Sequence, residues 1–132
     1  MAPTQQGYAL APGDGQAIWF LGALATSKAS SEQTHNAFAL QEHGYAPGLE
    51  PPLHLHREQD EAFSVLEGAL FVWCGDQTWR VSAGSFALLP RGLVHGFKVE
   101  EITPVKMLVL TFPGGPAGFE PVVEEIDRKS VV

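Results

Sequence analysis

Two histidines and a glutamate in the middle of the chain have the types and spacing of metal ligands. His54 and His56 are separated by one residue, and Glu61 follows after a short polar stretch. On an extended strand, alternate side chains leave the same face, so both imidazoles would point the same way. Neutral imidazoles with a nearby carboxylate are a common donor set for divalent first-row metals. The pattern is therefore typical of a metal site, although two histidines on a wet strand face need no metal.

A third histidine lies in a second segment that supports the same interpretation. Residues 84–90 read as a strand, Pro90-Arg-Gly92 as a turn, and His95 as the start of the next strand. Antiparallel packing could bring His95 to the first two histidines. Spacing alone leaves both interpretations open, a metal site and a set of solvated strand histidines.

The composition bounds the class of protein that could carry such a site. The chain has 132 residues, 45% of them hydrophobic and 17% charged, which fits one domain with a proper core. Fourteen glycines and ten prolines suit many short strands and tight turns better than a helical bundle. A net charge of −7 and a pI near 5.1 argue against a nucleic-acid partner, whose phosphates demand a basic face.

The sequence also bears on membrane insertion and on the cellular compartment. No apolar run approaches the roughly 20 residues of a membrane span, and the first residues lack the basic and apolar regions of a signal peptide. Cys74 is the only cysteine, so no internal disulfide can form. We expect a cytoplasmic protein in a reducing compartment.

Regularly spaced strand patterns predict an all-β sandwich or barrel. Eight to ten short strands are expected over residues 16–112, after an N-terminal arm at 1–15 and before a C-terminal segment at 113–132. The apolar run Gln16–Lys28 reads as one long, largely buried strand that bends at Gly22. We expect this strand, from Ala17 on, to form the open sheet edge through which a homodimer would assemble.

Two further segments have a readable periodicity. Residues 36–43 read as a second strand, with Phe38 and Leu40 on one face. Near the C-terminus, helical spacing predicts a short helix that packs across one barrel end, through Phe119, Val122, Val123 and Ile126.

The chain resembles the cupin superfamily in two motifs. The first motif runs glycine, five residues, His-x-His, three or four residues, glutamate, six residues, glycine, and it matches Gly48, His54, His56, Glu61 and Gly68. The second motif matches at Gly84, Pro90, Gly92 and His95, while Val99 stands where asparagine is expected. Looser similarity to small quercetinase-like bacterial cupins extends from about Trp19 to Phe119.

The resemblance implies a double-stranded β-helix, or jelly-roll barrel, that binds one divalent metal ion. Carried over by position, the ligands are His54, His56, Glu61 and His95. Zinc is our first expectation, and nickel, iron, manganese and cobalt accept the same donors. Glu61 is the least secure ligand, because a carboxylate there can also act as a base beside the metal. If a fourth imidazole replaced it, His43 or His35 would have to supply it, although each more readily reads as a surface or hydrogen-bonding histidine.

Strand parity suggests which side chains would surround the metal and contact a substrate. Glu61 shares a face with Phe63 and Val65, and His95 shares one with Phe97. Parity cannot decide the face of three further aromatic candidates, Phe38, Phe86 and Trp19. Each of these side chains has the alternative role of plain core packing.

The resemblance favours a catalytic role on a flat, mostly apolar substrate. Few cations are placed to point inward, Lys106 being the exception, which argues against phosphorylated substrates. The first hypothesis is a polyketide cyclase, in which the metal stabilises an enolate during aldol-type closure and dehydration in aromatic polyketide biosynthesis. The second is a quercetin-type flavonol dioxygenase, with Glu61 as base. The third is a metal- or ligand-binding cupin without catalysis.

Overall fold

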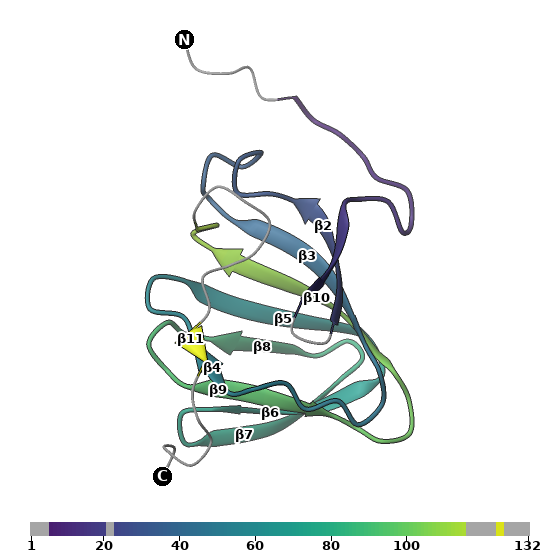
Figure 1. Ribbon diagram of the computed structural model, residues 1–132, viewed down its shortest axis with the longest axis vertical. Coiled ribbons are helices and arrows are strands. Elements are labelled where there is room, and N and C mark those ends of the chain that lie inside the picture. The colour runs from purple at the N-terminus through teal and green to yellow at the C-terminus, as the bar shows by residue number, and fades with distance from the viewer. Residues whose placement is uncertain (1–5, 21–22, 116–123, 126–132) are drawn as a thin grey trace.

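Short strands separated by glycine turns build two antiparallel sheets that face each other (Figure 1). The structure is a computed structural model that describes residues 6–20, 23–115 and 124–125. The first sheet has the order β1-β2-β3-β10-β5-β8, and the second has the order β11-β4-β9-β6-β7. Within the described residues all regular structure is strand, so the expectation of an all-β jelly roll is confirmed.

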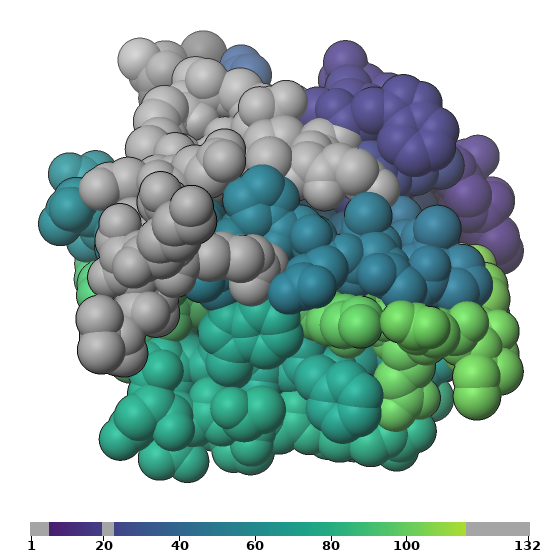
Figure 2. Space-filling model, turned by 60° about the horizontal axis from the view of Figure 1, so that its bottom comes forward, coloured from purple at the N-terminus to yellow at the C-terminus, as the bar shows by residue number. Residues whose placement is uncertain are grey.

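The strand bounds follow the predicted pattern closely in the middle of the chain. In chain order the strands are β1 Ala17–Phe20, β2 Ala23–Ala29, β3 Ala39–Tyr45, β4 His54–Leu55, β5 Asp60–Glu67, β6 Ala69–Cys74, β7 Gln77–Ser82, β8 Phe86–Leu89, β9 His95–Val99, β10 Val105–Phe112 and β11 Glu124–Glu125. Gly75 and Asp76 connect β6 to β7 as a two-residue hairpin turn, with Cys74 paired to Gln77. Figure 2 shows the β6–β7 side of the molecule.

The core lies between the sheets and is contributed by alternate residues of the long strands. Phe63 and Val65 of β5 are 1% exposed, and Met107 of β10 is wholly buried. From the second sheet, Leu70 and Val72 of β6 are also wholly buried. This period of two fixes which β5 and β9 side chains point inward, and therefore where the candidate ligands point.

The start of the chain departs from the prediction. The expected single strand over 16–28 is instead a hairpin, in which β1 pairs with β2 from Ala17 opposite Thr26 to Phe20 opposite Ala23. It is also less buried than expected, since Trp19 is 77% exposed. A run of apolar residues resembles a buried strand even when half of it lies at a sheet edge. β1 is indeed the edge strand of its sheet, as predicted.

The predicted C-terminal helix is wrong for the part of it that the structure describes. Glu124 and Glu125 form β11, which pairs with Leu55 and His54 of β4. The edge of β4 offers unpaired backbone groups that a strand can satisfy and a helix cannot. The apolar positions that suggested a helix lie outside the described residues: Phe119, Val122, Val123 and Ile126. Over the described residues, no helix is long and apolar enough to cross a membrane.

Candidate metal centre

The three histidines reach one another because β4 pairs with β9. His54 of β4 stands directly opposite His95 of β9, and His56 follows one residue after β4 ends. The backbone carbonyl of His56 accepts a hydrogen bond of 2.7 Å from the amide of Gly92, the glycine of the Pro-x-Gly turn. The second-motif turn therefore holds the first-motif histidine in place.

Four donor atoms converge on one point inside the barrel. His54, His56, Glu61 and His95 are all buried, and each offers one atom that lies within 4.8 Å of the other three. Nε2 of His54 and Nε2 of His95 are 3.0 Å apart. Oε2 of Glu61 lies 2.5 Å from Nε2 of His56 and 4.0 Å from Nε2 of His95.

These separations fit one metal ion. Bonds of about 2.1 Å to nitrogen and oxygen place adjacent donors of an octahedral shell about 3 Å apart and opposite donors about 4.2 Å apart. The distances of 2.5 Å, 3.0 Å and 4.0 Å fall close to this range. Three imidazoles and one carboxylate are donors that zinc and its neighbours in the first transition row accept. The His54, His56, Glu61 and His95 cluster could therefore hold a divalent ion.

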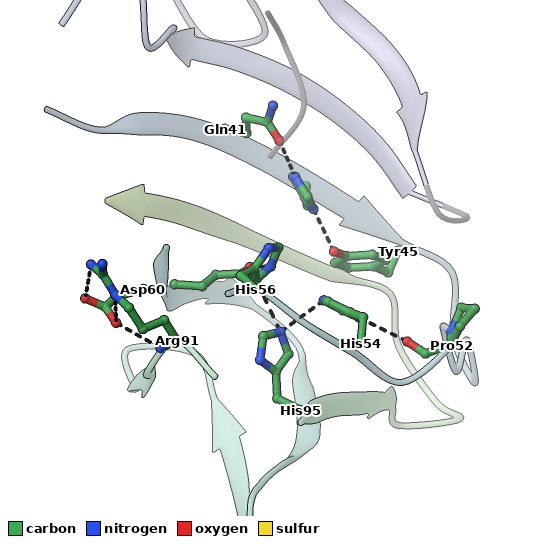
Figure 3. Close-up of polar contacts among 10 residues, drawn as sticks. Gln41, Tyr45, Pro52, His54, His56, Asp60, Arg91 and His95 are labelled. Carbon is green, nitrogen blue, oxygen red and sulfur yellow. Dashed lines mark hydrogen bonds and ion pairs between the residues drawn. The ribbon is translucent and has the colours of Figure 1, made fainter. Parts of the chain in front are cut away.

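Backbone contacts set the direction of the His54 lone pair. Nδ1 of His54 lies 3.1 Å from the carbonyl oxygen of Pro52 (Figure 3). A carbonyl only accepts, so Nδ1 carries the hydrogen, and Nε2 of a neutral ring then has a free lone pair. An outer hydrogen bond of this kind is the usual way in which a ligating histidine is oriented.

Burial and mutual charge interactions shape the ionisation of the cluster. Burial acts to raise the pKa of Glu61, but the hydrogen bond with His56 and the charges of His95, His56 and His54 prevail and lower it to about 2. For His95, burial lowers the pKa to about 4, against the opposing charge of Glu61. At neutral pH the carboxylate is thus ionised and His95 is neutral, which are the states that bind a metal.

Glu61 rather than its neighbour Asp60 belongs to the cluster. The Asp60 carboxylate accepts hydrogen bonds from the backbone amide of Arg91 at 2.9 Å and from its guanidinium at 3.0 Å. The side-chain and then the backbone hydrogen bonds of Arg91 lower the pKa of Asp60. This ion pair, visible in Figure 3, ties the start of β5 to the Pro-x-Gly turn and so supports Glu61 from the outer face.

Three of the six predicted substrate-contact residues are buried inside the barrel, on the strands β5 and β9 that carry Glu61 and His95. Phe63, Val65 and Phe97 are at most 3% exposed. The ring of Phe97 packs edge-on against Phe63 at 5.8 Å and against Tyr45 at 4.9 Å, measured between ring centroids. These rings form an aromatic wall two residues along the strands from His95 and Glu61.

The structure does not bring the other three predicted contact residues to the cluster. Phe86 pairs with Ser64, which alternates with the inward residue Phe63, so Phe86 faces outward and is 66% exposed. Trp19 lies on the edge strand β1 at 77% exposure, and Phe38 precedes β3 at 37% exposure. Aromatic character does not show which face of a strand a side chain occupies. These three segments also contain no candidate metal ligand from which the alternation of faces could be counted.

The two remaining histidines are outside the cluster. His35 lies in an exposed turn with a φ of 54°. His43 is buried in β3, but its Nε2 lies 2.8 Å from Oε1 of Gln41 and its Nδ1 lies 2.6 Å from the hydroxyl of Tyr45. Both ring nitrogens are thus engaged in hydrogen bonds, and Glu61 supplies the fourth donor of the cluster.

Sequence reasoning missed two polar features of the interior. Gln41, His43 and Tyr45 occupy the inner face of β3, whereas Leu40, on which the strand was read, is only half-buried. Gln59, in the short polar stretch before Glu61, is 2% exposed, and its Nε2 has no hydrogen-bond partner among the described residues. The alternation Gln-x-His-x-Tyr along β3 could have shown that these three side chains share one face of the strand. A search for alternating apolar residues does not detect it.

The described cations lie away from the interior. Lys106, the one lysine whose strand position suggested an inward side chain, is exposed on β10. Arg80 pairs with Glu100 and Arg91 pairs with Asp60. Over residues 6–20, 23–115 and 124–125, no lysine or arginine is buried.

Comparisons with known proteins agree with this architecture. A family profile described as "Cupin domain" matches residues 41–111. Quercetin 2,3-dioxygenase from Bacillus subtilis (strain 168) is 27% identical over 93 residues, which are 70% of this chain. The chain spans only 28% of that relative's length.

Solved structures share the fold. The polyketide cyclase RemF from Streptomyces resistomycificus superposes with a TM-score of 0.73 at 23% identity, covering 92% of this chain and 87% of RemF. KdgF from Halomonas sp. has a TM-score of 0.71 at 18% identity, covering 82% of this chain and 94% of KdgF. Because the family profile covers more than half of the sequence and includes all four clustered side chains, the chain belongs to the cupin family.

Proposed function

We propose that this cupin is a metal-dependent enzyme that acts on a flat polyphenolic or polyketide substrate, and that it is a polyketide cyclase. The observation that carries the proposal is the convergence of four buried donor atoms beside the aromatic wall of Phe63, Phe97 and Tyr45. The likeness to RemF over 92% of the chain supports this choice at the level of the fold. We propose zinc as the ion, held by His54, His56, Glu61 and His95.

The chemistry divides between the ion and the chain. A bound divalent ion supplies a Lewis acid that polarises a ketone and makes the neighbouring methylene more acidic. Glu61 is ionised at neutral pH, and its carboxylate would turn away from the ion to accept the proton that the methylene releases. Phe63 and Phe97 exclude water and hold the chain of ketones folded, so that the new carbon–carbon bond forms between atoms already in contact.

A flavonol dioxygenase is the second candidate, and the sequence match to the Bacillus subtilis quercetin 2,3-dioxygenase favours it. In this case Glu61 removes the proton of a flavonol hydroxyl, and dioxygen is consumed. A third candidate, a cupin that binds a ligand without converting it, predicts neither reaction.

Two assays on the metal-loaded protein separate the candidates. A synthetic poly-β-ketone, analysed by mass spectrometry, should lose one water for each aromatised ring and consume no oxygen. Oxygen uptake with quercetin would support the dioxygenase instead. Both activities should vanish in His54→Ala. Binding of the poly-β-ketone and of quercetin without conversion of either would support the third candidate and contradict the enzyme proposals.

We further propose that the chain forms a homodimer through the edge strand β1. This strand leaves one side of its backbone unpaired in the described sheet and carries Trp19 at 77% exposure, both features of a surface that pairs with another chain. Sedimentation should give twice the mass of one chain for the wild type and a shift toward the monomer for Trp19→Lys. An unchanged mass in that variant would contradict this assignment of the interface.

A further inference from the structure

Three polar side chains form a continuous hydrogen-bonded row along the inner face of β3. Gln41, His43 and Tyr45 are 5%, 6% and 7% exposed, respectively. Nε2 of His43 lies 2.8 Å from Oε1 of Gln41, and Nδ1 of His43 lies 2.6 Å from the Tyr45 hydroxyl. Figure 3 shows the row on its own strand, beside the histidines of the metal centre.

The row is out of place in a purely structural core. Across the neighbouring strand β10, the residues paired with Gln41, His43 and Tyr45 are Val109, Met107 and Val105, and all three are buried. At these three positions the adjacent strand β10 thus places apolar side chains in the core, whereas β3 places polar ones there. Burying an imidazole, an amide and a phenol carries a desolvation cost that apolar side chains avoid. Such polar groups in an otherwise apolar interior commonly mark a functional site.

The hydrogen bonds in the row run in one direction. The amide oxygen of Gln41 only accepts, so Nε2 of His43 carries the hydrogen. Burial lowers the pKa of His43 to about 4, so the ring is neutral and its Nδ1 accepts. The Tyr45 hydroxyl must then donate to Nδ1. Its proton is committed to His43, and its oxygen keeps only lone pairs for any other partner.

The Tyr45 end of the row borders the metal centre. The Tyr45 ring packs on Phe97 at 4.9 Å, and Phe97 lies two residues after His95 on the same face of β9. Burial first, and the charge of Glu61 second, raise the pKa of Tyr45 well above its usual range. The phenol is thus within electrostatic reach of the carboxylate in the metal centre and stays protonated at neutral pH.

We propose that Tyr45 is a substrate-binding residue whose oxygen accepts a hydrogen bond from a phenol or enol hydroxyl of the substrate, with His43 and Gln41 as positioning residues. The inference rests on the proposed function and deepens it, because it states which substrates the site selects. A substrate with a free hydroxyl at this point binds well, and the same substrate carrying a methyl ether there has no hydrogen to donate.

The test compares quercetin with its mono-O-methyl ethers as probes of the metal-loaded protein. The dissociation constants are measured by titration calorimetry for the wild type, Tyr45→Phe, His43→Leu and His43→Asn. In the wild type, methylation of one hydroxyl should weaken binding by about tenfold more than methylation of the others, the size expected for one lost buried hydrogen bond. Tyr45→Phe and His43→Leu should reduce that difference to about twofold or less.

His43→Asn separates positioning from packing, because its side-chain oxygen can still accept from Tyr45. This variant should recover most of the tenfold preference, and His43→Leu should not. Metal content and melting temperature of each variant show that the barrel and the ion are retained. If the wild type binds neither these probes nor the synthetic poly-β-ketone, the proposed function fails, and if it binds the poly-β-ketone but none of the quercetin probes, this inference is overturned. If it binds the quercetin probes and Tyr45→Phe keeps the full preference, only this inference is overturned.

Discussion

His54 and His95 face each other across the pair that joins β4 to β9, with their Nε2 atoms 3.0 Å apart. The Pro52 carbonyl engages Nδ1 of His54, so the Nε2 of His54 presents a lone pair toward its partner. At this distance the Nε2 lone pair of His54 needs a partner, which is either a hydrogen on Nε2 of His95 or a cation. This relationship, with the Glu61 carboxylate close by, is the physical reason to expect that a cation stabilises the barrel.

Metal binding should raise the stability of the metal-free protein. At a zinc concentration of a hundred times the dissociation constant, the free energy of unfolding should rise by about 2.7 kcal/mol, which raises the melting temperature by about 10 °C in a chain of this size. Differential scanning calorimetry with and without zinc measures the shift. His54→Ala should lose it. His35→Asn is the matched control, since His35 lies outside the cluster in an exposed turn with positive φ, and it should keep the shift.

The metal-free protein should lose stability between pH 7 and pH 5. Burial lowers the pKa of His43 from its ordinary value of 6.5, which the unfolded chain keeps, to about 4 in the folded protein. The unfolded chain therefore binds more protons between these values, and stability falls as the pH falls, by about 2 kcal/mol at pH 5 for this one residue. Urea unfolding at the two pH values measures the loss, which should be smaller in His43→Asn. An equal loss in both proteins would contradict the burial of a neutral His43.

The inward and outward phenylalanines should differ sharply in their effect on stability. Phe63 is 1% exposed, and Phe63→Ala should lower the free energy of unfolding by about 3–5 kcal/mol through lost burial and a cavity. Phe86 is 66% exposed, and Phe86→Ala should change it by less than about 1 kcal/mol and leave zinc binding intact. Chemical denaturation of both variants gives the comparison, and similar losses would mean that strand β8 presents the opposite face.

Two motif glycines should tolerate alanine to different degrees. Gly68 has a φ of 79°, and a Cβ there would lie 2.4 Å from the backbone oxygen of Pro104. Gly84 has a φ of 87° and nothing within 4 Å of such a Cβ. Gly84→Ala should therefore cost only the left-handed backbone penalty, about 1–2 kcal/mol. Gly68→Ala should cost more, because the β5–β6 turn must also move away from Pro104. Urea midpoints rank the two variants, and equal costs would refute the steric argument.

Much of the site could be predicted because its residues sit in short, regular patterns. The alternation His54-x-His56 placed two imidazoles together, and the Pro-x-Gly turn placed His95 at the first residue of β9. Parity from Glu61 and His95 then placed Phe63, Val65 and Phe97 correctly in the interior. These predictions held because a period of two leaves a strand residue only two faces to choose from.

The parts that failed depend on pairing partners that a single segment does not reveal. Apolar content alone could not show that the run from Ala17 folds into a hairpin that leaves Trp19 exposed, or that Glu124 and Glu125 pair with β4. On β3, the interior face is the polar one, because it carries the row from Gln41 to Tyr45 beside the metal centre. Burial rules that place apolar residues inside assign such a strand to the wrong face.

The metal content of the protein tests the central claim most directly. Protein purified without added metal salts and analysed by inductively coupled plasma mass spectrometry should contain about one divalent ion per chain. His95→Ala should contain less than about a tenth of that, while His35→Asn should match the wild type. A wild-type protein that takes up no divalent ion, even after incubation with zinc, would contradict the account. A His95→Ala protein that still contains about one divalent ion per chain would also contradict it.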